Sequence, residues 1–512
     1  MSEQIESGVL ERVSTTPPAV GESYYLPHHP VVRRDHASTK VRIVFDASSK
    51  VAGPSLNNAL HEGPSLIAEL FQILMRFRLF KVAVIADIEK AFLNIEINEL
   101  DRDFLRCLWL EGFDPRQPNC LDSVKVQTLR FTRVPFGVCS SPFHLGATLN
   151  FHIEKYKETC PDTVEALKRD LYVDNLISGS DTVEGGLTLF VQAKDMLKQG
   201  GFNLRQFSTN APELQRLVET TVYETPQSSH YLTYSEFIET SIEHPLGNLE
   251  EKVLGIVWNK EADKFVFRFE RLLEFVKGVK ISKRFLMRVI ARVYDPLGLI
   301  CPLMIPLKCT LREVCELGVS WDEKLPERYV KRILKWFREI EALESIEFPR
   351  CLANHNVKDL KASQLVAFSD ASDVAFGATI FLRTETSDEI DSNLLVAKSR
   401  VAPKGQTLPR KELLGALQMS KLFEVARNVV SSVLKVNEEF YFSDSKTALC
   451  WIKNREGRFK QFVEKRATTI RETTDPSRWD HVKGIENPAD ITTRAINPLE
   501  LKESRKWFKE PE

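Results

Sequence analysis

The stretch Asp170-Leu171-Tyr172-Val173-Asp174-Asn175-Leu176-Ile177-Ser178 decides how this chain is interpreted. Residues 170–173 and 176–178 can pair as two short strands, and an Asp-Asn step tolerates the turn conformations that join such strands. Taken alone, the stretch predicts only a hairpin, because Asp and Asn are ordinary turn residues. Acidic residues elsewhere in the chain favour a catalytic interpretation of this hairpin.

A second carboxylate follows an apolar run upstream. Residues 81–86, Lys-Val-Ala-Val-Ile-Ala, predict a buried strand that presents Asp87 at its end. Asp174 can meet Asp87 across a sheet and hold divalent metal with it. Two-metal phosphoryl transfer needs such a carboxylate cluster, with the ions about 3.5–4 Å apart. Mg²⁺ is the expected ion, since it takes few protein carboxylates and keeps positions for water and phosphate; Mn²⁺ is the alternative.

The hairpin resembles the catalytic Tyr-x-Asp-Asp hairpin of reverse transcriptases, with the last aspartate replaced by Asn175. This resemblance implies that Asp87 and Asp174 are catalytic metal ligands. It also implies that Asn175 lowers polymerase activity.

Residues 38–46, Ser-Thr-Lys-Val-Arg-Ile-Val-Phe-Asp, look like the fingers segment of the same enzymes. In that family, basic residues of this segment bind the incoming triphosphate. The resemblance implies this role for Arg42 first and for Lys40 second. Taken singly, Arg42 fits a surface cation equally well.

Two further segments carry the resemblance. Phe92 lies five residues after Asp87, where the family places an aromatic ring that excludes a 2′-hydroxyl group. Residues 133–142, Arg-Val-Pro-Phe-Gly-Val-Cys-Ser-Ser-Pro, resemble the segment that lies under template and nucleotide, so Phe136 and Gly137 are substrate-binding candidates. Alone, Phe92 fits a core residue and Pro-Phe-Gly fits a turn. The order of all four motifs favours the functional interpretation.

The second half contains four acids that resemble the carboxylates of ribonuclease H: Asp370, Glu412, Asp444 and Asp490. Residues 365–370 and 377–382 predict two strands that lie side by side. Residues 440–444 predict another strand that ends in an acid, followed by a helix over 446–453. The resemblance implies that all four acids bind metal and are catalytic.

Helix start signals place two of these acids. Pro409 favours a helix start, which predicts Glu412 in the first turn. Asn487 is a predicted N-cap before Pro488, which puts Asp490 in a first turn. An acid at a helix start is often only dipole-stabilising, and His481 is a lesser candidate for proton transfer, since a lone His is more often structural. The order of the four acids along the chain favours a ribonuclease H-like site over a dipole-stabilising role for Asp490.

The region between the two halves points to a subfamily. Residues 253–259, Val-Leu-Gly-Ile-Val-Trp-Asn, look like the primer grip, but a segment from about 208 to 249 separates them from the hairpin. This insertion, together with residues 292–299 and 321–326, resembles the BEL/Pao class of LTR retrotransposon Pol proteins over about residues 24–495. Some members carry a Pao peptidase label in this region. Aspartic peptidases of the retroviral type need an Asp-Thr/Ser-Gly loop, and this tripeptide does not occur here.

We therefore expect an α/β and α+β multidomain chain with right-hand polymerase fingers and palm, a connection region and a ribonuclease H-like mixed sheet with helices. Its 512 residues suffice for several domains. The predicted boundaries are an N-terminal segment over 1–22, fingers and palm over 23–210, a Pao-type thumb and connection over 211–355, the ribonuclease H-like domain over 356–496 and a tail over 497–512. Apolar residues at helical spacing over 330–340 predict a tether helix, with a partner-binding helix as the alternative.

The amino-acid composition limits which binding partners and which cellular compartment are expected. The net charge of −1 gives no global signal for nucleic acid, so binding requires local patches such as Arg33, Arg34, Lys40 and Arg42. Nine scattered cysteines without a Cys-x-x-Cys pair favour a reducing compartment and argue against a zinc module. No stretch predicts a signal peptide or membrane span. The expected location is cytoplasmic, with virus-like particles as one setting.

The sequence thus predicts an RNA-directed DNA polymerase with ribonuclease H activity. The expected partners are RNA template, DNA primer, RNA–DNA hybrid and deoxynucleoside triphosphates, with no membrane; the oligomeric state is left open. No integrase or nucleocapsid module is visible, so the chain is expected to be a segment of Pol. The alternative is a noncatalytic nucleic-acid-binding or interaction protein derived from a decayed or host-adopted retroelement, and Asn175 is the residue that favours it.

Overall fold

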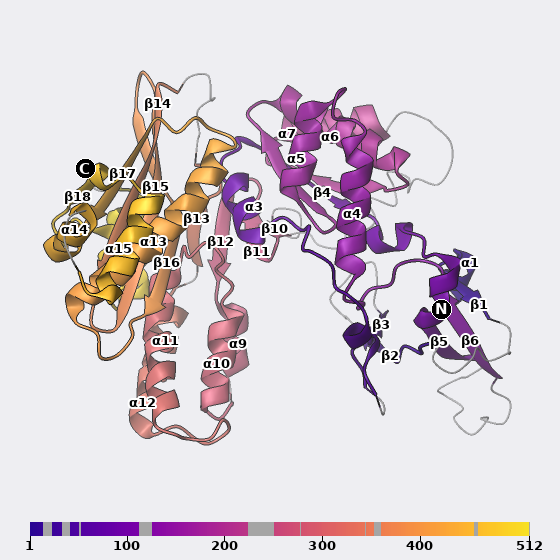
Figure 1. Cartoon of the computed structure of the whole chain (residues 1–512), viewed down its shortest axis with the longest axis horizontal. Coiled ribbons are helices and arrows are strands. Elements are labelled where there is room, and N and C mark those ends of the chain that lie inside the picture. The colour runs from indigo at the N-terminus through magenta and orange to yellow at the C-terminus, as the bar shows by residue number, and fades with distance from the viewer. Residues whose placement is uncertain are drawn as a thin grey trace.

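The structure, a computed structural model, describes residues 1–13, 23–32, 41–50, 53–111, 125–223, 250–276, 278–343, 345–352, 360–454 and 459–510, with only the backbone of Val41 and Arg42. Along the long axis the chain runs from the N-terminal sheets at one end to the C-terminal sheet at the other (Figure 1). Within the described ranges, no helix is both long enough and apolar enough to cross a bilayer. The mixture of antiparallel and mixed sheets with helices is the predicted multidomain class.

The N-terminal end contains two small antiparallel sheets, one of three strands in the order β1-β6-β5 and one formed by β2 and β3. Their bounds, with those of the nearby helices, are α1 (Ser2–Glu6), β1 (Leu10–Arg12), β2 (His28–Val32), β3 (Val41–Phe45), α2 (Leu56–Ala59), η1 (Ala91–Asn94), η2 (Glu99–Leu105), β5 (Arg106–Glu111) and β6 (Lys125–Phe131). Phe45 packs edge-to-face on Phe131 with the ring centroids 4.8 Å apart, which joins the two sheets in one core.

The palm is a four-stranded antiparallel sheet in the order β7-β8-β4-β9. Its elements are α3 (Leu70–Phe77), β4 (Val82–Ile88), α4 (Ser141–Glu154), α5 (Pro161–Asp170), β7 (Leu171–Tyr172), β8 (Asn175–Ser180), α6 (Val183–Gln199), β9 (Leu204–Ser208), α7 (Pro212–Val218) and the π-helix η4 (Glu219–Tyr223). β4 is buried on both faces, with Val84 in the core under α4 to α6 and Ile85 in a second core with α3. This confirms the buried strand that the apolar run predicted.

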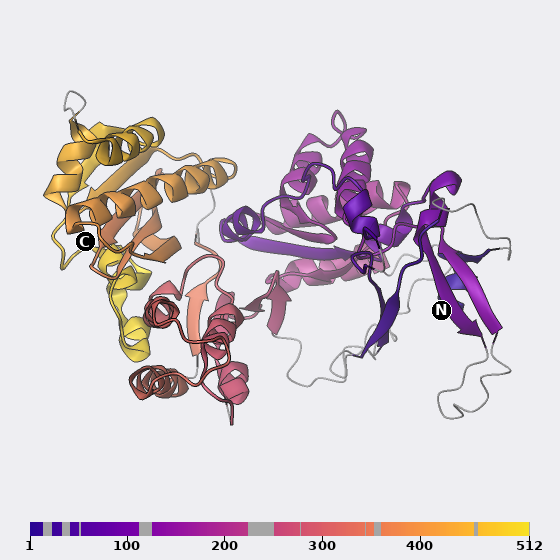
Figure 2. The same cartoon turned by 60° about the horizontal axis from the view of Figure 1, so that its bottom comes forward.

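A second four-stranded sheet, β10-β11-β12-β13, and four helices follow the palm. The bounds are β10 (Glu250–Val253), β11 (Ile256–Asn259), β12 (Lys264–Arg268), α9 (Glu270–Val276), α10 (Lys283–Arg292), α11 (Cys301–Glu316), α12 (Glu327–Glu341) and β13 (Ser345–Pro349). Figure 2 shows the four helices gathered beside the C-terminal domain. The predicted helix over 330–340 is α12, which buries Val330, Ile333, Phe337 and Ile340. Of the inserted segment, residues 224–249 lie outside the described residues.

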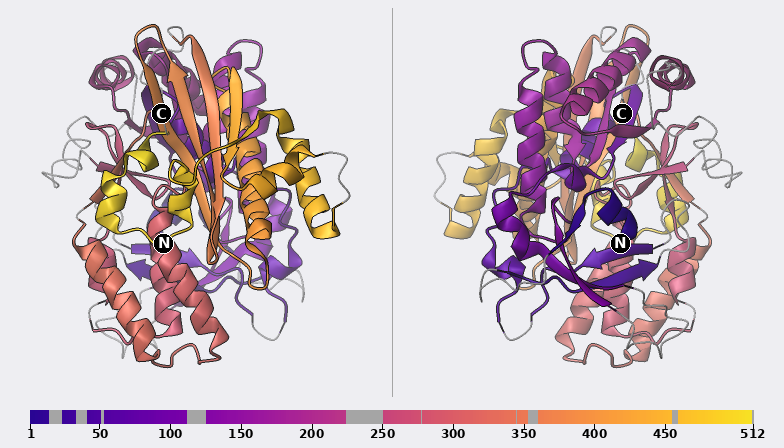
Figure 3. Two further views of the ribbon diagram at one scale, coloured as in Figure 1. Left: turned by 90° about the vertical axis from the view of Figure 1, so that its left-hand side faces the viewer. Right: turned by 90° about the vertical axis from the view of Figure 1, so that its right-hand side faces the viewer.

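The C-terminal domain is a five-stranded mixed sheet in the order β16-β15-β14-β17-β18, with β14, β17 and β18 parallel (Figure 3). The bounds are β14 (Ala362–Ala371), β15 (Ala375–Glu385), β16 (Ile390–Val401), α13 (Leu408–Ser431), β17 (Glu438–Ser443), α14 (Lys446–Lys453), α15 (Gln461–Thr473), η6 (Pro476–Arg478), β18 (Trp479–His481), η7 (Pro488–Thr492), α16 (Pro498–Glu503) and α17 (Arg505–Phe508). The predicted strand pair and the helix over 446–453 are confirmed.

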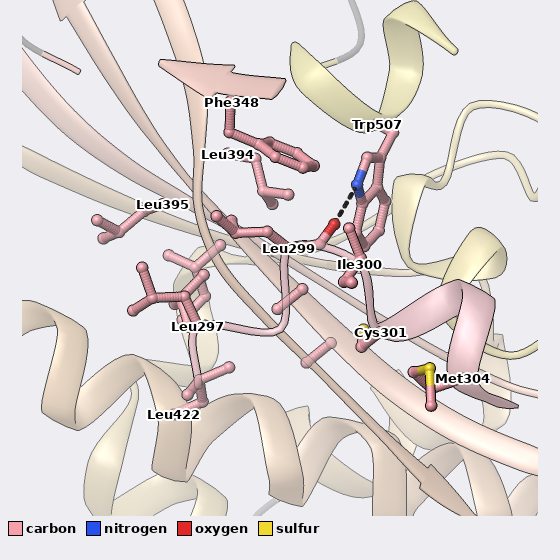
Figure 4. Close-up of a cluster of buried hydrophobic side chains, with 14 of the residues drawn as sticks. Leu297, Leu299, Ile300, Cys301, Met304, Phe348, Leu394, Leu395, Leu422 and Trp507 are labelled. Carbon is pink, nitrogen blue, oxygen red and sulfur yellow. Dashed lines mark hydrogen bonds between the residues drawn. The ribbon is translucent and has the colours of Figure 1, made fainter. Parts of the chain in front are cut away.

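The loop between α10 and α11 docks on the C-terminal sheet (Figure 4). The Leu297 carbonyl accepts from the Ala397 N–H of edge strand β16 at 2.9 Å, and Trp507 donates its indole N–H to the Leu299 carbonyl at 2.8 Å. Gly298 has φ +72°, and a Cβ there would lie 1.9 Å from the Ala397 carbonyl oxygen. Only glycine fits this close approach, which fixes the connecting region on the sheet.

Buried arginines tie the palm to the rest of the chain. Arg350 is fully buried, pairs with Asp263 at 2.5 Å and donates to the carbonyls of Phe77 and Phe80 at the end of α3. Arg78 donates to the Leu395 carbonyl in β16 at 2.6 Å. Because each buried guanidinium has several carbonyl or carboxylate acceptors, these junctions are specific in orientation.

A third contact joins the palm to the end of α13. Arg76 pairs with the buried Asp170 at 2.9 Å and donates to Ser432 Oγ at 3.1 Å, while Arg169 donates to the Ser432 carbonyl at 3.2 Å. Ser432 is the C-cap residue of α13. The helix therefore spans from the C-terminal sheet to the base of β7.

Candidate active sites

Three acids of the C-terminal domain meet in one cluster. A carboxylate oxygen from each of Asp370, Glu412 and Asp444 lies within 4.8 Å of the other two. Asp370 lies near the end of β14 and Asp444 directly after β17, and these neighbouring strands are parallel, so both side chains arrive at one edge of the sheet. The structure thus brings together three of the four predicted ribonuclease H-like residues.

Glu412 reaches the cluster from α13, which crosses the sheet. The prediction of Glu412 in the first turn is wrong: α13 begins at Leu408, with Thr407 as N-cap, so Pro409 is the second helical residue and Glu412 falls in the next turn. A Cβ on Gly415 would lie 2.8 Å from the Asp370 carbonyl oxygen. This glycine lets the helix approach β14 closely enough for Glu412 to join Asp370.

The electrostatics of the cluster favour neutralisation of its carboxylates by a proton or a cation. Burial, followed by the charges of Asp370 and Asp444, raises the pKa of Glu412 to about 9. Burial also raises the pKa of Asp370 to about 6, against the hydrogen bond from Thr493, and raises the pKa of Asp444. Glu412 Oε2 and Asp444 Oδ1 are buried without a hydrogen-bond partner among the described residues. Unsatisfied carboxylate oxygens facing one another fit hard divalent ions such as Mg²⁺ or Mn²⁺.

Asp490 lies at the margin of this cluster. The Asn487 side chain accepts from the Ala489 N–H, which confirms the predicted cap, although η7 is a 3-10 helix. Asp490 pairs with Arg494 at 2.7 Å and is not one of the three acids within 4.8 Å. His481 ends β18 with an exposed side chain, and its charge lowers the pKa of Asp444, while burial is the larger effect on that acid.

In the palm, Asp87 and Asp174 also lie together. Asp87 is the register partner of Asn175 across β4 and β8, and the Ile88 N–H donates to the Asp174 carbonyl at 2.7 Å. Burial, followed by the charge of Asp174, raises the pKa of Asp87 to about 6, against the opposing charge of Arg205. Burial raises the pKa of Asp174 as well. The predicted pair of palm carboxylates is therefore present.

The hairpin turn differs from the expected one. The turn residues are Val173 and Asp174, whereas Asn175 already belongs to β8. Val173 has φ +57°, a left-handed conformation that costs a β-branched residue about 1–3 kcal/mol. Asn175 donates its amide N–H to Asp174 Oδ1 at 2.7 Å. One oxygen of the palm pair is thus hydrogen-bonded inside the protein.

The substrate-binding candidates Phe92, Phe136 and Gly137 lie where the fingers meet the palm. The rings of Phe92 and Phe136 are nearly perpendicular with centroids 4.8 Å apart; Phe92 is 7% exposed and Phe136 is 54% exposed. Gly137 has φ +95°, and a Cβ there would lie 2.6 Å from the Phe45 carbonyl oxygen of β3. Lys40, Arg33 and Arg34 lie outside the described residues, as does the side chain of Arg42.

Three sets of contacts around the two candidate sites were missed from the sequence. Arg205 on β9 lies 3.7 Å from Asp87 and pairs with Glu89 at 3.0 Å. Asp170 accepts from Arg76 and from Ser178 Oγ, which fixes the base of the hairpin. Arg494 follows Asp490 by four residues, a spacing that predicts a helical ion pair. The partners of Asp170 and Arg205 come from elements far away in the sequence, so no local sequence pattern predicts these contacts.

Comparison with known proteins agrees with this geometry. Residues 282–445 match the family described as the Pao retrotransposon-like RNaseH-like domain. The chain is also similar in structure to the foamy viral protease-reverse transcriptase in complex with RNA/DNA hybrid, with TM-score 0.54 and 14% identity over 94% of this chain and 52% of that chain. This chain therefore spans about half of that protein, and at this identity the likeness concerns the fold. No curated protein matches.

The fold is that of a reverse transcriptase joined to a ribonuclease H-like domain. The matched segment begins in the connecting region and includes the docking loop at Leu297. It also contains Asp370, Glu412 and Asp444. The match over residues 282–445 agrees with the resemblance to Pao/BEL retrotransposon Pol proteins that the motifs carry.

Proposed function

We propose that this chain cleaves the RNA strand of an RNA–DNA hybrid by metal-dependent hydrolysis. The observation that carries the proposal is the cluster of Asp370, Glu412 and Asp444. Glu412 and Asp444 each present a buried oxygen that has no hydrogen-bond partner among the described residues. Charged oxygens in such a cluster are costly to bury unless a proton or a cation neutralises them, and a divalent cation would neutralise several at once. The family match over residues 282–445 and the hybrid named with the viral relative support the substrate class.

The protein's own residues prepare the site. Asp370, Glu412 and Asp444 would hold the metal ions, with Asp490 at the margin. Divalent ions held there would supply the positive charge that activates an attacking water and stabilises the leaving oxygen. Thr493 donates to Asp370 Oδ2 and so orients the other carboxylate oxygen of this residue. Burial of Glu412 and Asp370 excludes water from one side of the cluster and strengthens every charge interaction within it.

The test uses the full-length chain and an RNA–DNA hybrid with Mg²⁺ or Mn²⁺. The parent should degrade the RNA strand and leave the DNA strand intact. Asp444→Asn should abolish cleavage while the melting temperature stays near that of the parent. Asp480→Asn is the matched control, because Asp480 is exposed on the neighbouring strand and pairs only with Lys453 among the described residues. A folded parent that leaves hybrid RNA intact with both metals contradicts the proposal.

A second activity, RNA-directed DNA synthesis, is supported by the palm pair Asp87 and Asp174. Its partners would be RNA template, DNA primer and deoxynucleoside triphosphates. Asn175 weakens this site, because it replaces a negative charge with an amide and occupies one oxygen of Asp174. Primer extension by the parent and by Asn175→Asp measures how much activity remains. Hybrid binding without either activity would instead favour the noncatalytic alternative.

A further inference from the structure

The C-terminal helix α17 places a lysine at the edge of the acid cluster. Lys506 donates to the carbonyl of Ile485 at 3.1 Å, in the loop that connects β18 to η7. α17 packs against η7, the element that carries Asp490. Lys506 therefore belongs to the surroundings of the candidate site, although it lies outside the family segment 282–445.

The position of Lys506 is fixed by its neighbours. Trp507 is fully buried and donates to the Leu299 carbonyl at 2.8 Å (Figure 4). Phe508 packs on Phe348 with the ring centroids 4.9 Å apart. A helix of four residues has little stability of its own, so the buried Trp507 and the partly buried Phe508 hold α17, and with it Lys506, against the rest of the protein.

The charge of Lys506 faces the acids without forming an ion pair. Burial lowers its pKa, whereas the charges of Asp490 and Asp370 raise it and that of Arg494 lowers it. Among the described residues, its hydrogen-bond partner is a neutral carbonyl, and Asp490 pairs with Arg494 instead. A partly buried ammonium group with one neutral partner keeps two N–H donors for an anion.

The surface beside Lys506 is open. Ile485, whose carbonyl accepts from Lys506, has a side chain that is 83% exposed. An apolar side chain held in water beside a cation and a carboxylate cluster marks a face that a sugar-phosphate strand can cover. Metal ions at the acids would neutralise the carboxylates and leave the ammonium group as the local excess charge.

We propose that Lys506 binds a backbone phosphate of the RNA strand next to the bond that the acid cluster cleaves. The ligand class is thus a polyanionic strand, and Lys506 positions it without taking part in bond breaking. This inference rests on the proposed hydrolysis of hybrid RNA. It assigns to the C-terminal segment after η7 a part of the substrate site.

The test compares Lys506→Gln with Lys502→Gln in the full-length protein. Lys502 is exposed in the last turn of α16, so its substitution removes the same charge from the same segment. Lys506→Gln should lower kcat/KM for hybrid cleavage about 10-fold, mainly through KM, and reduce the slope of log binding constant against log salt by about 1. Lys502→Gln should leave both quantities near the parent values, and Lys506→Arg should restore most of the binding.

Hybrid binding, measured by fluorescence anisotropy over a salt series, separates the two proposals. A parent that binds hybrid but does not cleave it contradicts the proposed hydrolysis. Equal salt slopes for the parent, Lys502→Gln and Lys506→Gln contradict the phosphate site. A lower melting temperature of Lys506→Gln with an unchanged slope would assign Lys506 a purely structural role and also overturn the inference.

Discussion

Replacing Asn175 by aspartate should turn the palm into a stronger metal site while weakening the metal-free protein. The substitution removes the hydrogen bond from Asn175 to Asp174 Oδ1, which is 2.7 Å long and has a charged acceptor. Loss of such a bond costs about 1.5–3 kcal/mol. The new carboxylate also repels Asp87, whose pKa is already raised to about 6 by burial and by the charge of Asp174.

Bound metal should restore the folding stability that Asn175→Asp loses. A ligand present at 100 times its dissociation constant stabilises the folded state by about 2.7 kcal/mol, which is comparable to the hydrogen bond that was removed. The comparison is best made in the Asp444→Asn background, where the C-terminal cluster contributes little metal binding. The melting temperature of Asn175→Asp should then be lower than that of its parent in chelator and should rise more steeply with Mg²⁺ or Mn²⁺.

The same pair of proteins tests catalysis. If Asn175 removes about 1.4–4 kcal/mol of transition-state stabilisation, restoring aspartate should raise the rate of primer extension roughly 10- to 1,000-fold. Primer–template binding by both proteins is the control. The reasoning is refuted if Asn175→Asp binds primer–template, gains no additional stability from metal and extends primers no faster than its parent.

Three other predictions concern separate parts of the chain. Because the pKa of Glu412 is raised from 4.5 to about 9, the folded metal-free protein keeps a proton that the unfolded chain loses, so its stability should fall as the pH rises through this window; Glu412→Gln should remove this part of the pH dependence in melting curves recorded with chelator. Phe92→Ala should cost about 3–5 kcal/mol as a buried truncation and, in the Asn175→Asp background, admit ribonucleotides beside Phe136; an unchanged deoxy-to-ribo preference would return Phe92 to the core. Gly298→Ala should lower the melting temperature, because its Cβ would lie 1.9 Å from the Ala397 carbonyl oxygen; an unaltered melting curve would contradict the docking of this loop.

Local patterns predicted the parts of the two sites that depend on local structure. The apolar runs before Asp87 and Asp444 form strands, and Asn487 caps the turn that presents Asp490. Strand-end acids can be predicted because burial requires apolar runs, and a carboxylate is tolerated where the run ends. The order of these motifs along the chain was sufficient to predict the fold, and the family match over residues 282–445 agrees with the predicted Pao/BEL resemblance.

Contacts between distant elements could not be predicted in this way. The start of α13 at Leu408 shifted Glu412 by one turn, and Val173 occupies a left-handed turn that its side chain disfavours. The approach of Lys506 to η7 depends on packing of the last elements against one another. The domain boundaries and the cytoplasmic location stay predictions.

The helix α13 sets a fixed spacing between the two candidate sites. It carries Glu412 near its start and ends at Ser431, and its C-cap residue Ser432 contacts Arg76 and Arg169 at the base of the hairpin. Its 24 residues make a rod roughly 36 Å long. The distance between the two sites along a bound duplex would therefore be constant. RNA cleavage should fall at a constant number of nucleotides from the primer terminus, whatever the base sequence of the template.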